Sequence, residues 1–188
     1  MFAQFKKSLW RTAWYRVQQF RQGWQASVQP AELVAAVGYL PVLAADRFQQ
    51  LPRDAQRHSL NVLQTLQRQG PLSPDLAAAA LLHDVGKLAA DEAGLRINLW
   101  VRGPLVLLEH VAPQLLARWA SPDVGHGWRY LLYVHQMHPL IGAQWATAWG
   151  CTPLTCWLIE HHQDHLATAP RNEAEQLLLL LQWADSEN

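Results

Sequence analysis

The chain has 188 residues, half of them hydrophobic, and its 15 basic residues balance its 15 acidic residues. This length and composition suit one compact domain with a core of its own, which excludes an intrinsically disordered chain. The balanced charge excludes a whole-molecule field that would attract nucleic acid, and no apolar run approaches the roughly 18 residues that a spanning helix needs. We therefore expect a cytoplasmic protein that binds no nucleic acid.

Residues 1–29 predict a basic amphipathic helix. The stretch from Met1 to Pro30 contains five basic residues and no acidic one. Apolar side chains recur in it at helical spacing: Phe2, Phe5, Leu9, Ala13, Val17, Phe20 and Trp24. One interpretation is that residues 1–25 bind a partner or the inner face of a membrane, with the basic face on anionic headgroups. The other is that the same stripe packs on the protein's own domain.

Residues 30–188 predict one domain of helices joined by short loops. Pro52 can begin a helix that carries His58 and ends before Gly70 and Pro71. His58 shares a face of this helix with apolar residues that repeat at helical spacing. The first candidate site residue is therefore expected beside the core.

An alanine-rich helix is predicted from Asp75 to Asp84. Ser73 and Pro74 form a suitable cap and first turn for it. Gly86, just beyond its end, is predicted to adopt a left-handed conformation that stops the helix. The pair His83 and Asp84 is therefore expected at a helix end.

The second half of the chain continues the helical pattern, with breaks at proline and glycine. Helices are predicted at residues 95–111 with a break at Gly103 and Pro104, and at 113–119, 128–137, 140–149, 153–162 and 173–185. Because Pro139 separates two of them, His138 is expected at a helix junction. The predicted fold is all-α, a helical bundle preceded by the amphipathic helix.

Imidazole and carboxylate side chains recur along this bundle in a pattern that indicates a site for two metal ions. They are His58, His83, Asp84, His138, His161, His162 and Asp185. Mixed sets of this kind suit iron, manganese, nickel, cobalt or zinc. Asp84 ends a strongly apolar helix, where a desolvated carboxylate costs several kcal/mol unless a positive charge accompanies it. A cation meets that requirement.

Several of these residues stand in segments that resemble a known family. The segment LLHDVGK, from Leu81 to Lys87, resembles the signature of the HD-domain superfamily of metal-dependent phosphohydrolases in its HDxGK form. RHSLNV, which contains His58, is similar to the helix that supplies that family's first histidine. HPLIGA, from His138, and the pair His161 and His162 resemble elements of the binuclear branch, which includes the HD-GYP phosphodiesterases. Asp185 falls where the family's last aspartate lies, and the resemblance covers about residues 52–188.

The resemblance implies a ligand scheme. One ion would be held by His58, His83, Asp84 and Asp185, and a second by Asp84 as a bridge, His138 and one or both of His161 and His162. Adjacent helical residues point about 100° apart, so which of the two histidines binds stays open. The implied reaction is hydrolysis of a phosphoester or phosphoanhydride of a nucleotide or other small phosphorylated metabolite, by water that two divalent transition-metal ions activate.

Three basic residues are candidates for substrate contacts. Lys87 can reach a phosphate oxygen or brace Asp84, which we expect to be the central catalytic carboxylate; the alternative is a solvated lysine at a helix end. Arg53 and Arg57 flank His58 and can contact phosphate through their planar donors, or simply lie on the surface.

The chain also departs from the family pattern. After His162 it reads QDHLATAPR, without the GYP motif, so cyclic-dinucleotide specificity does not follow. Two further classes of function stay open. Some HD-domain proteins with the same ligand order are mixed-valent di-iron oxygenases, and degenerate relatives are non-catalytic docking or sensory modules. The intact His83, Asp84 and Lys87 disfavour the last class.

Overall fold

The computed structural model describes residues 27–95, 113–166 and 168–188, and all regular structure in these ranges is helical. The expected all-α fold is confirmed. The expected helices at residues 1–29 and 95–111 fall mainly on residues 1–26 and 96–112, which lie outside the described part of the chain. No described helix has the length and apolar character needed to cross a membrane.

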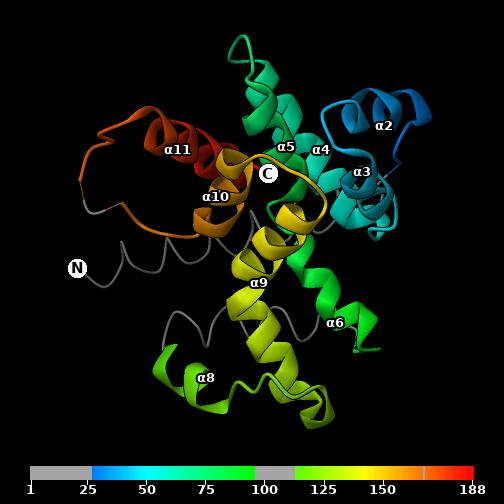
Figure 1. Cartoon of the computed structure of the whole chain (residues 1–188), viewed down its shortest axis with the longest axis vertical. Helices are drawn as coiled ribbons and strands as arrows, with labels where there is room; N and C mark the ends of the chain where they lie inside the picture. The colour runs from blue at the N-terminus through cyan, green and yellow to red at the C-terminus, as the bar shows by residue number, and fades with distance from the viewer. Residues whose placement is uncertain (1–26, 96–112, 167) are drawn as a thin grey trace, which may run out of the picture.

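The helices lie as Figure 1 shows, with α5 and α4 at the centre, α2 and α3 on one side, α10 and α11 on the other, and α9 extending away beside α6 and α8. Their bounds are α2 (Pro30–Val37), α3 (Val42–Gln49), α4 (Arg53–Gln67), α5 (Pro74–Leu82), the 3-10 helix η1 (Val85–Lys87), α6 (Leu88–Glu92), α8 (Pro113–Trp119), the 3-10 helix η2 (Val124–His126), α9 (Trp128–Ala148), α10 (Pro153–His161) and α11 (Glu173–Ser186).

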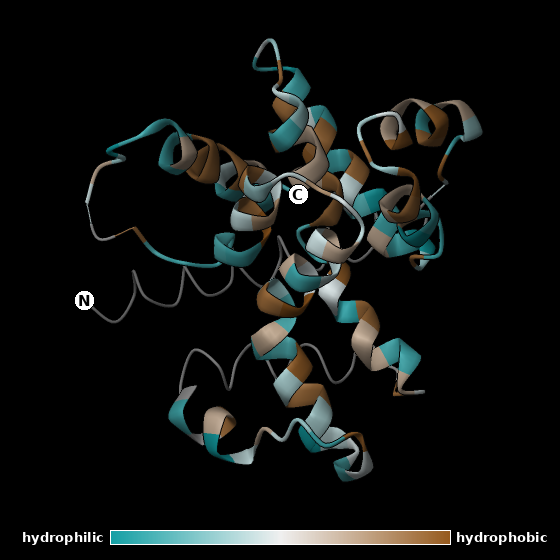
Figure 2. Ribbon diagram, in the orientation of Figure 1, coloured by the Kyte–Doolittle hydropathy of each residue, from teal (hydrophilic) through white to brown (hydrophobic). Residues whose placement is uncertain are grey.

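The central helix α5 begins and is buried as its sequence predicts. The Ser73 hydroxyl accepts a hydrogen bond from the amide of Leu76, and Pro74 occupies the first turn. The side chains from Leu76 to Leu82 are all buried, against α4, α10 and α11. The small alanines let these helices approach closely, and α11 turns a mostly apolar sequence to the same core (Figure 2). This packing brings α4 and the C-terminal ends of α10 and α11 to the end of α5, around His83.

The expected helix junction at His138 is wrong, because α9 runs through Pro139 as one continuous helix. Proline has no backbone N–H, so the carbonyl of His135, four residues earlier, lacks its helical donor. The His138 side chain supplies the replacement, since its Nδ1 lies 2.7 Å from that carbonyl oxygen. The hydrogen bond that repairs the helix also fixes the orientation of the imidazole.

The expected left-handed stop at Gly86 is also wrong. Gly86 lies in η1 and is not among the glycines with positive φ, and the chain continues directly into α6. A glycine is required here because of close packing: a Cβ at this position would lie 2.1 Å from the carbonyl oxygen of His138. The backbone of η1 therefore lies directly on the backbone of α9.

Candidate metal centre

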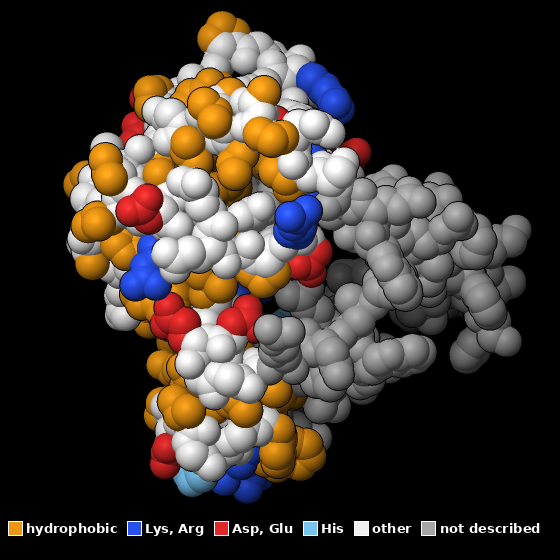
Figure 3. All heavy atoms as spheres, turned by 90° about the vertical axis from the view of Figure 1, so that its right-hand side faces the viewer, with side chains coloured by type: hydrophobic (Ala, Val, Ile, Leu, Met, Phe, Trp, Pro, Cys, Tyr) orange, Lys and Arg blue, Asp and Glu red, His pale blue; other side chains and the backbone are white. Residues whose placement is uncertain are grey.

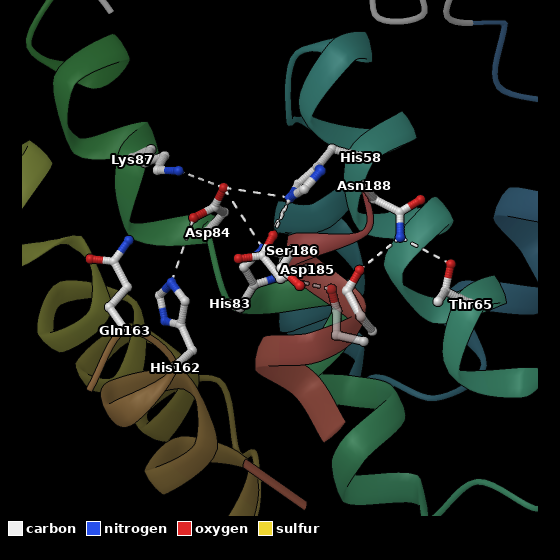
Figure 4. Close-up of polar contacts among 12 residues, drawn as sticks. His58, Thr65, His83, Asp84, Lys87, His162, Gln163, Asp185, Ser186 and Asn188 are labelled. Carbon is white, nitrogen blue, oxygen red and sulfur yellow. Dashed lines mark hydrogen bonds and ion pairs between the residues drawn. The ribbon is translucent and has the colours of Figure 1, made fainter. Parts of the chain in front are cut away.

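Asp84 lies in the sharp turn between α5 and η1. Helix α5 ends at Leu82, and the backbone of Asp84 leaves the helical region at φ −99° and ψ 2°. The close contact of Gly86 with α9 holds this turn against His138. The carboxylate is consequently directed between α4 and α11 on one side and α9 and α10 on the other (Figure 4).

A first group of potential ligands combines side chains of α4, the end of α5 and α11. It consists of His58, His83 and Asp185, whose ligand atoms all lie within 4.8 Å of one another. Asp185 Oδ1 is 3.0 Å from His58 Nε2 and 3.5 Å from His83 Nε2. His58 and Asp185 lie 127 residues apart in the chain, and the packing of α11 on α4 brings them together.

A second group combines the turn after α5 with α9 and the end of α10. It consists of Asp84, His138 and His162. Asp84 Oδ1 lies 3.2 Å from His138 Nε2 and 3.8 Å from His162 Nε2. This is again a set of one carboxylate and two imidazoles.

The two carboxylate oxygens of Asp84 face different groups. Oδ1 faces His138 and His162, whereas Oδ2 lies 4.0 Å from His58 Nε2 and 3.8 Å from His83 Nε2. A carboxylate in this position can bind two cations at once, one through each oxygen. The geometry therefore joins the two groups through a single residue.

Backbone carbonyls fix the orientation of three of the imidazoles. Nδ1 of His83, His138 and His162 lies 3.0, 2.7 and 2.7 Å from the carbonyl oxygens of residues 80, 135 and 159 respectively. A carbonyl can only accept, so each Nδ1 carries the hydrogen and each Nε2 presents a lone pair to the site. Metal-binding histidines are commonly held in this way.

The lone pairs of the site need a positive partner. His162 Nε2 is buried and has no hydrogen-bond partner among the described residues. His58 Nε2 and His83 Nε2 lie only 3.2 Å apart. A buried acceptor without a donor, such as His162 Nε2, is costly, and a cation would satisfy it together with the neighbouring ring nitrogens. The donor set therefore fits metal ions.

The protonation states agree with this interpretation. Burial and the neighbouring His83 lower the pKa of His162 to about 3, and burial lowers the pKa of His138, so both rings are neutral at pH 7. Burial raises the pKa of Asp84, but the Lys87 ammonium and the imidazoles outweigh it and hold the pKa well below its usual range. The ligands of the second group are thus ready to bind a cation.

His83 differs from these histidines. Burial lowers its pKa, but the carboxylates of Asp84 and Asp185 outweigh burial, and the pKa rises above the usual histidine value. The two carboxylates therefore favour positive charge at His83, at the position where the first group would hold an ion. A metal ion would supply that charge in place of a proton, because a bound imidazole must be neutral.

The structure decides between the two adjacent histidines. His162 contributes to the second group, whereas His161 does not. The His161 ring packs on Trp157 with centroids 4.7 Å apart, and its Nδ1 lies 2.6 Å from Asp164 Oδ2. Six of the seven predicted ligands are therefore gathered, and His161 is directed elsewhere.

The predicted basic residues have three different environments. Lys87 Nζ lies 2.6 Å from Asp84 Oδ2, so it braces the central carboxylate. The Arg57 guanidinium donates to both oxygens of Glu32 at 2.7 Å, so the phosphate contact expected for Arg57 is replaced by an ion pair inside the protein. Arg53 is exposed, and no contact within the described part of the chain places it at the site.

One site residue was missed from the sequence. Gln163 follows α10 and lies beside His162 (Figure 4), and its amide Nε2 is 3.3 Å from His138 Nε2. Its position directly after His162 is the only signal in the sequence, and a glutamine in a polar segment carries no specific pattern. The structure places a neutral donor beside the second group.

Comparison of the chain with family models, curated proteins and solved structures found no match. The chemistry of the site follows from its own donors. Four imidazoles and two carboxylates, joined through Asp84, can hold two transition-metal ions close together, and such pairs support hydrolytic or oxygen-dependent reactions.

Proposed function

We propose that this protein is a metal-dependent phosphohydrolase of the HD-domain superfamily with a binuclear centre. Its substrate would be a nucleotide or another small phosphorylated metabolite. The observation that carries the proposal is the position of Asp84, whose two oxygens face two separate groups of ligands. The order of these ligands along the chain is also the order that the HDxGK resemblance implies.

The proposed ligands divide between two ions. His58, His83 and Asp185 would hold one ion together with Asp84 Oδ2, and His138 and His162 would hold the other together with Asp84 Oδ1. Iron, manganese, nickel, cobalt and zinc all suit such nitrogen and oxygen donors. When bound, a pair of divalent ions lowers the pKa of a water molecule and stabilises negative charge on phosphate oxygens.

The exposure of the ligands indicates where a substrate would approach. The side chains of His83 and His138 are fully buried and His162 is almost so, while His58 and Asp185 are 28% and 36% exposed. The site therefore has a buried floor and one open side, on which Lys87 also lies, partly exposed. A small phosphorylated molecule would approach the ions from this open side.

Two side chains at this open side would orient the substrate. Lys87 holds Asp84 through its Oδ2 and keeps that carboxylate ionised, and its ammonium lies where it can also donate to a phosphate oxygen. Gln163 presents an amide N–H beside His138 and can donate a second hydrogen bond. The two roles use the Lys87 ammonium and the neutral amide of Gln163.

The test combines metal analysis with a substrate panel. The purified protein is expected to contain two transition-metal ions per chain and to release phosphate or a nucleoside monophosphate from a panel of phosphoesters supplied with manganese, iron, nickel or cobalt. Asp84→Ala should lose both ions and all turnover, because it removes the shared ligand. Asp46→Ala, which removes an exposed carboxylate of α3, should retain both.

Other results would contradict the proposal. Turnover at the wild-type rate in Asp84→Ala would exclude the bridging role. Two bound irons with dioxygen uptake and no phosphate release would identify the oxygenase alternative. A protein that retains no metal and turns over nothing would be a non-catalytic module.

A further inference from the structure

Helix α10 ends just where the chain supplies His162 and Gln163 to the metal centre. The last backbone carbonyls of a helix have no donor within it, and α10 ends at His161. The described residues that follow, 163–166 and 168–172, contain no helix. Figure 3 shows the opposite side of the molecule, near α2 and α3, where the described side chains present no group of histidines. The second group of ligands therefore depends on what holds α10 on its own side of the bundle.

Gln182 of the neighbouring helix α11 donates to this end of α10. Its Nε2 lies 2.6 Å from the carbonyl oxygen of Asp164 and 3.5 Å from that of His161, and the shorter contact is the stronger of the two. Both partners can only accept, so the amide must present its nitrogen, whose two hydrogens allow one bond to each carbonyl. These carbonyls lie on either side of His162 and Gln163 in the chain. One side chain of α11 therefore holds this segment on both sides of the ligand.

The helix α11 also supplies Asp185 to the first group of ligands. Gln182 and Asp185 are three residues apart, so their side chains leave the same face of α11 about one turn apart. Asp185 Oδ1 lies 3.0 Å from His58 Nε2. The same part of α11 thus contacts the first group through a carboxylate and the end of α10 through an amide. A movement of α10 relative to α11 would change the separation of the two groups.

The two groups approach each other closely where α10 meets the end of α5. The rings of His83 and His162 have centroids 5.2 Å apart, and His162 Nε2 lies 3.8 Å from Asp84 Oδ1. The His162 ring is itself fixed to the carbonyl of Ile159 in α10, so it moves with the end of this helix. Sites of this kind must be held within about 0.5 Å of their productive geometry. A residue that fixes the end of α10 therefore fixes the ring.

We propose that Gln182 is a positioning residue of the metal centre. It holds His162 at a fixed distance from the first group of ligands and so sets the separation of the two ions. In this role it acts through the backbone of residues 161–164 and touches neither an ion nor the substrate. The inference rests on the proposed binuclear centre. It concerns the second ion, because the ligands of the first group come from α4, α5 and α11.

The experiment is a titration of the full chain with cobalt(II), in which calorimetry measures the affinity of each ion. Gln182→Met keeps the length of the side chain and removes both N–H donors, and Gln182→Lys restores a donor. The matched control is Gln176→Met, at an exposed glutamine of the same helix. A further protein combines His162→Gln with Gln182→Met and is compared with His162→Gln alone. Thermal unfolding is measured for every variant.

We expect Gln182→Met to bind the first ion as the wild type does and the second about fivefold more weakly, which corresponds to the loss of one neutral hydrogen bond. Gln182→Lys should recover most of this loss, and Gln176→Met should show none. When Gln182→Met is added to His162→Gln, the affinity of the remaining ion should not change, because the ring through which Gln182 acts is absent.

Three results would overturn the inference and leave the proposed function standing. The first is unchanged affinity for both ions in Gln182→Met. The second is equal weakening of both ions together with a lower unfolding temperature, which would show a general structural role. The third is an equal loss of affinity when Gln182→Met is added to His162→Gln. A wild type that binds no cobalt would contradict the proposed function itself, and the inference with it.

Discussion

Gly86 lies so close to His138 that no other residue fits between η1 and α9. A Cβ on Gly86 would be 2.1 Å from the His138 carbonyl oxygen, 2.8 Å from the amide nitrogen of Gly142 and 2.9 Å from the His138 carbonyl carbon. All three are backbone atoms, which cannot rotate away. The contact therefore sets the separation of Asp84 and His138, and hence the geometry of the second ligand group.

Gly86→Ala should separate η1 from α9. The cost of such overpacking is about 3 kcal/mol in the free energy of unfolding, and the displaced Asp84 should weaken metal retention as well. Denaturant unfolding and elemental analysis measure the two effects. Gly125→Ala is the matched control: a Cβ there would approach only the side chain of Asp123, and stability should change little. Equal stability of both variants would contradict the assigned role of Gly86.

The adjacent pair His161 and His162 permits a direct test of the ligand assignment. His162→Gln should lose the ion of the second group, since it removes an Nε2 that is buried among the other ligands. His161→Gln should retain both ions, because the His161 ring contacts Trp157 and Asp164 instead. The metal content per chain distinguishes these two variants. Loss of metal in His161→Gln with full retention in His162→Gln would reverse the assignment.

Gln163→Ala should separate substrate orientation from metal binding. The variant should keep both ions, because the amide is not a member of either ligand group. It should lower kcat/KM about tenfold, which corresponds to the loss of one neutral hydrogen bond of about 1 to 1.5 kcal/mol. Elemental analysis measures the metal content, and steady-state kinetics measure kcat/KM. Unchanged kinetics would exclude a contact of Gln163 with the substrate.

Glu32→Gln should lower stability in a pH-dependent way. The hydrogen bonds from Arg57 hold the pKa of Glu32 below its usual value of 4.5 in the folded protein. The stabilisation is therefore complete above pH 4.5 and is lost as pH falls through the folded-state pKa. At pH 7 we expect a loss of about 1 kcal/mol in the free energy of unfolding, and in acid the two proteins should converge.

The control for this measurement is Glu92→Gln. Glu92 pairs with Arg47 at 3.3 Å, but both side chains are about half exposed, and such pairs contribute little. Its stability should stay near that of the wild type over the whole pH range. A Glu32→Gln protein whose deficit persists unchanged in acid would show that the ion pair is not the cause.

Much of the local structure follows from the sequence. The cap at Ser73, the proline that begins α10 and the apolar run of α11 each give a helix where it was predicted. These signals act within a few residues, through capping and apolar periodicity, and need no distant partner. Pro139 misled the prediction, since a proline normally ends a helix and only the His138 side chain repairs the missing hydrogen bond.

By itself the sequence determined the types of donor, their order along the chain and the helices that carry them. Only the tertiary structure decided that His162 and not His161 faces the site, that Asp84 directs one oxygen to each group, and that Gly86 serves for contact and not for a left-handed turn. The reason is geometric. Adjacent helical residues point about 100° apart, and which of them faces inward depends on how helices distant in the chain pack together.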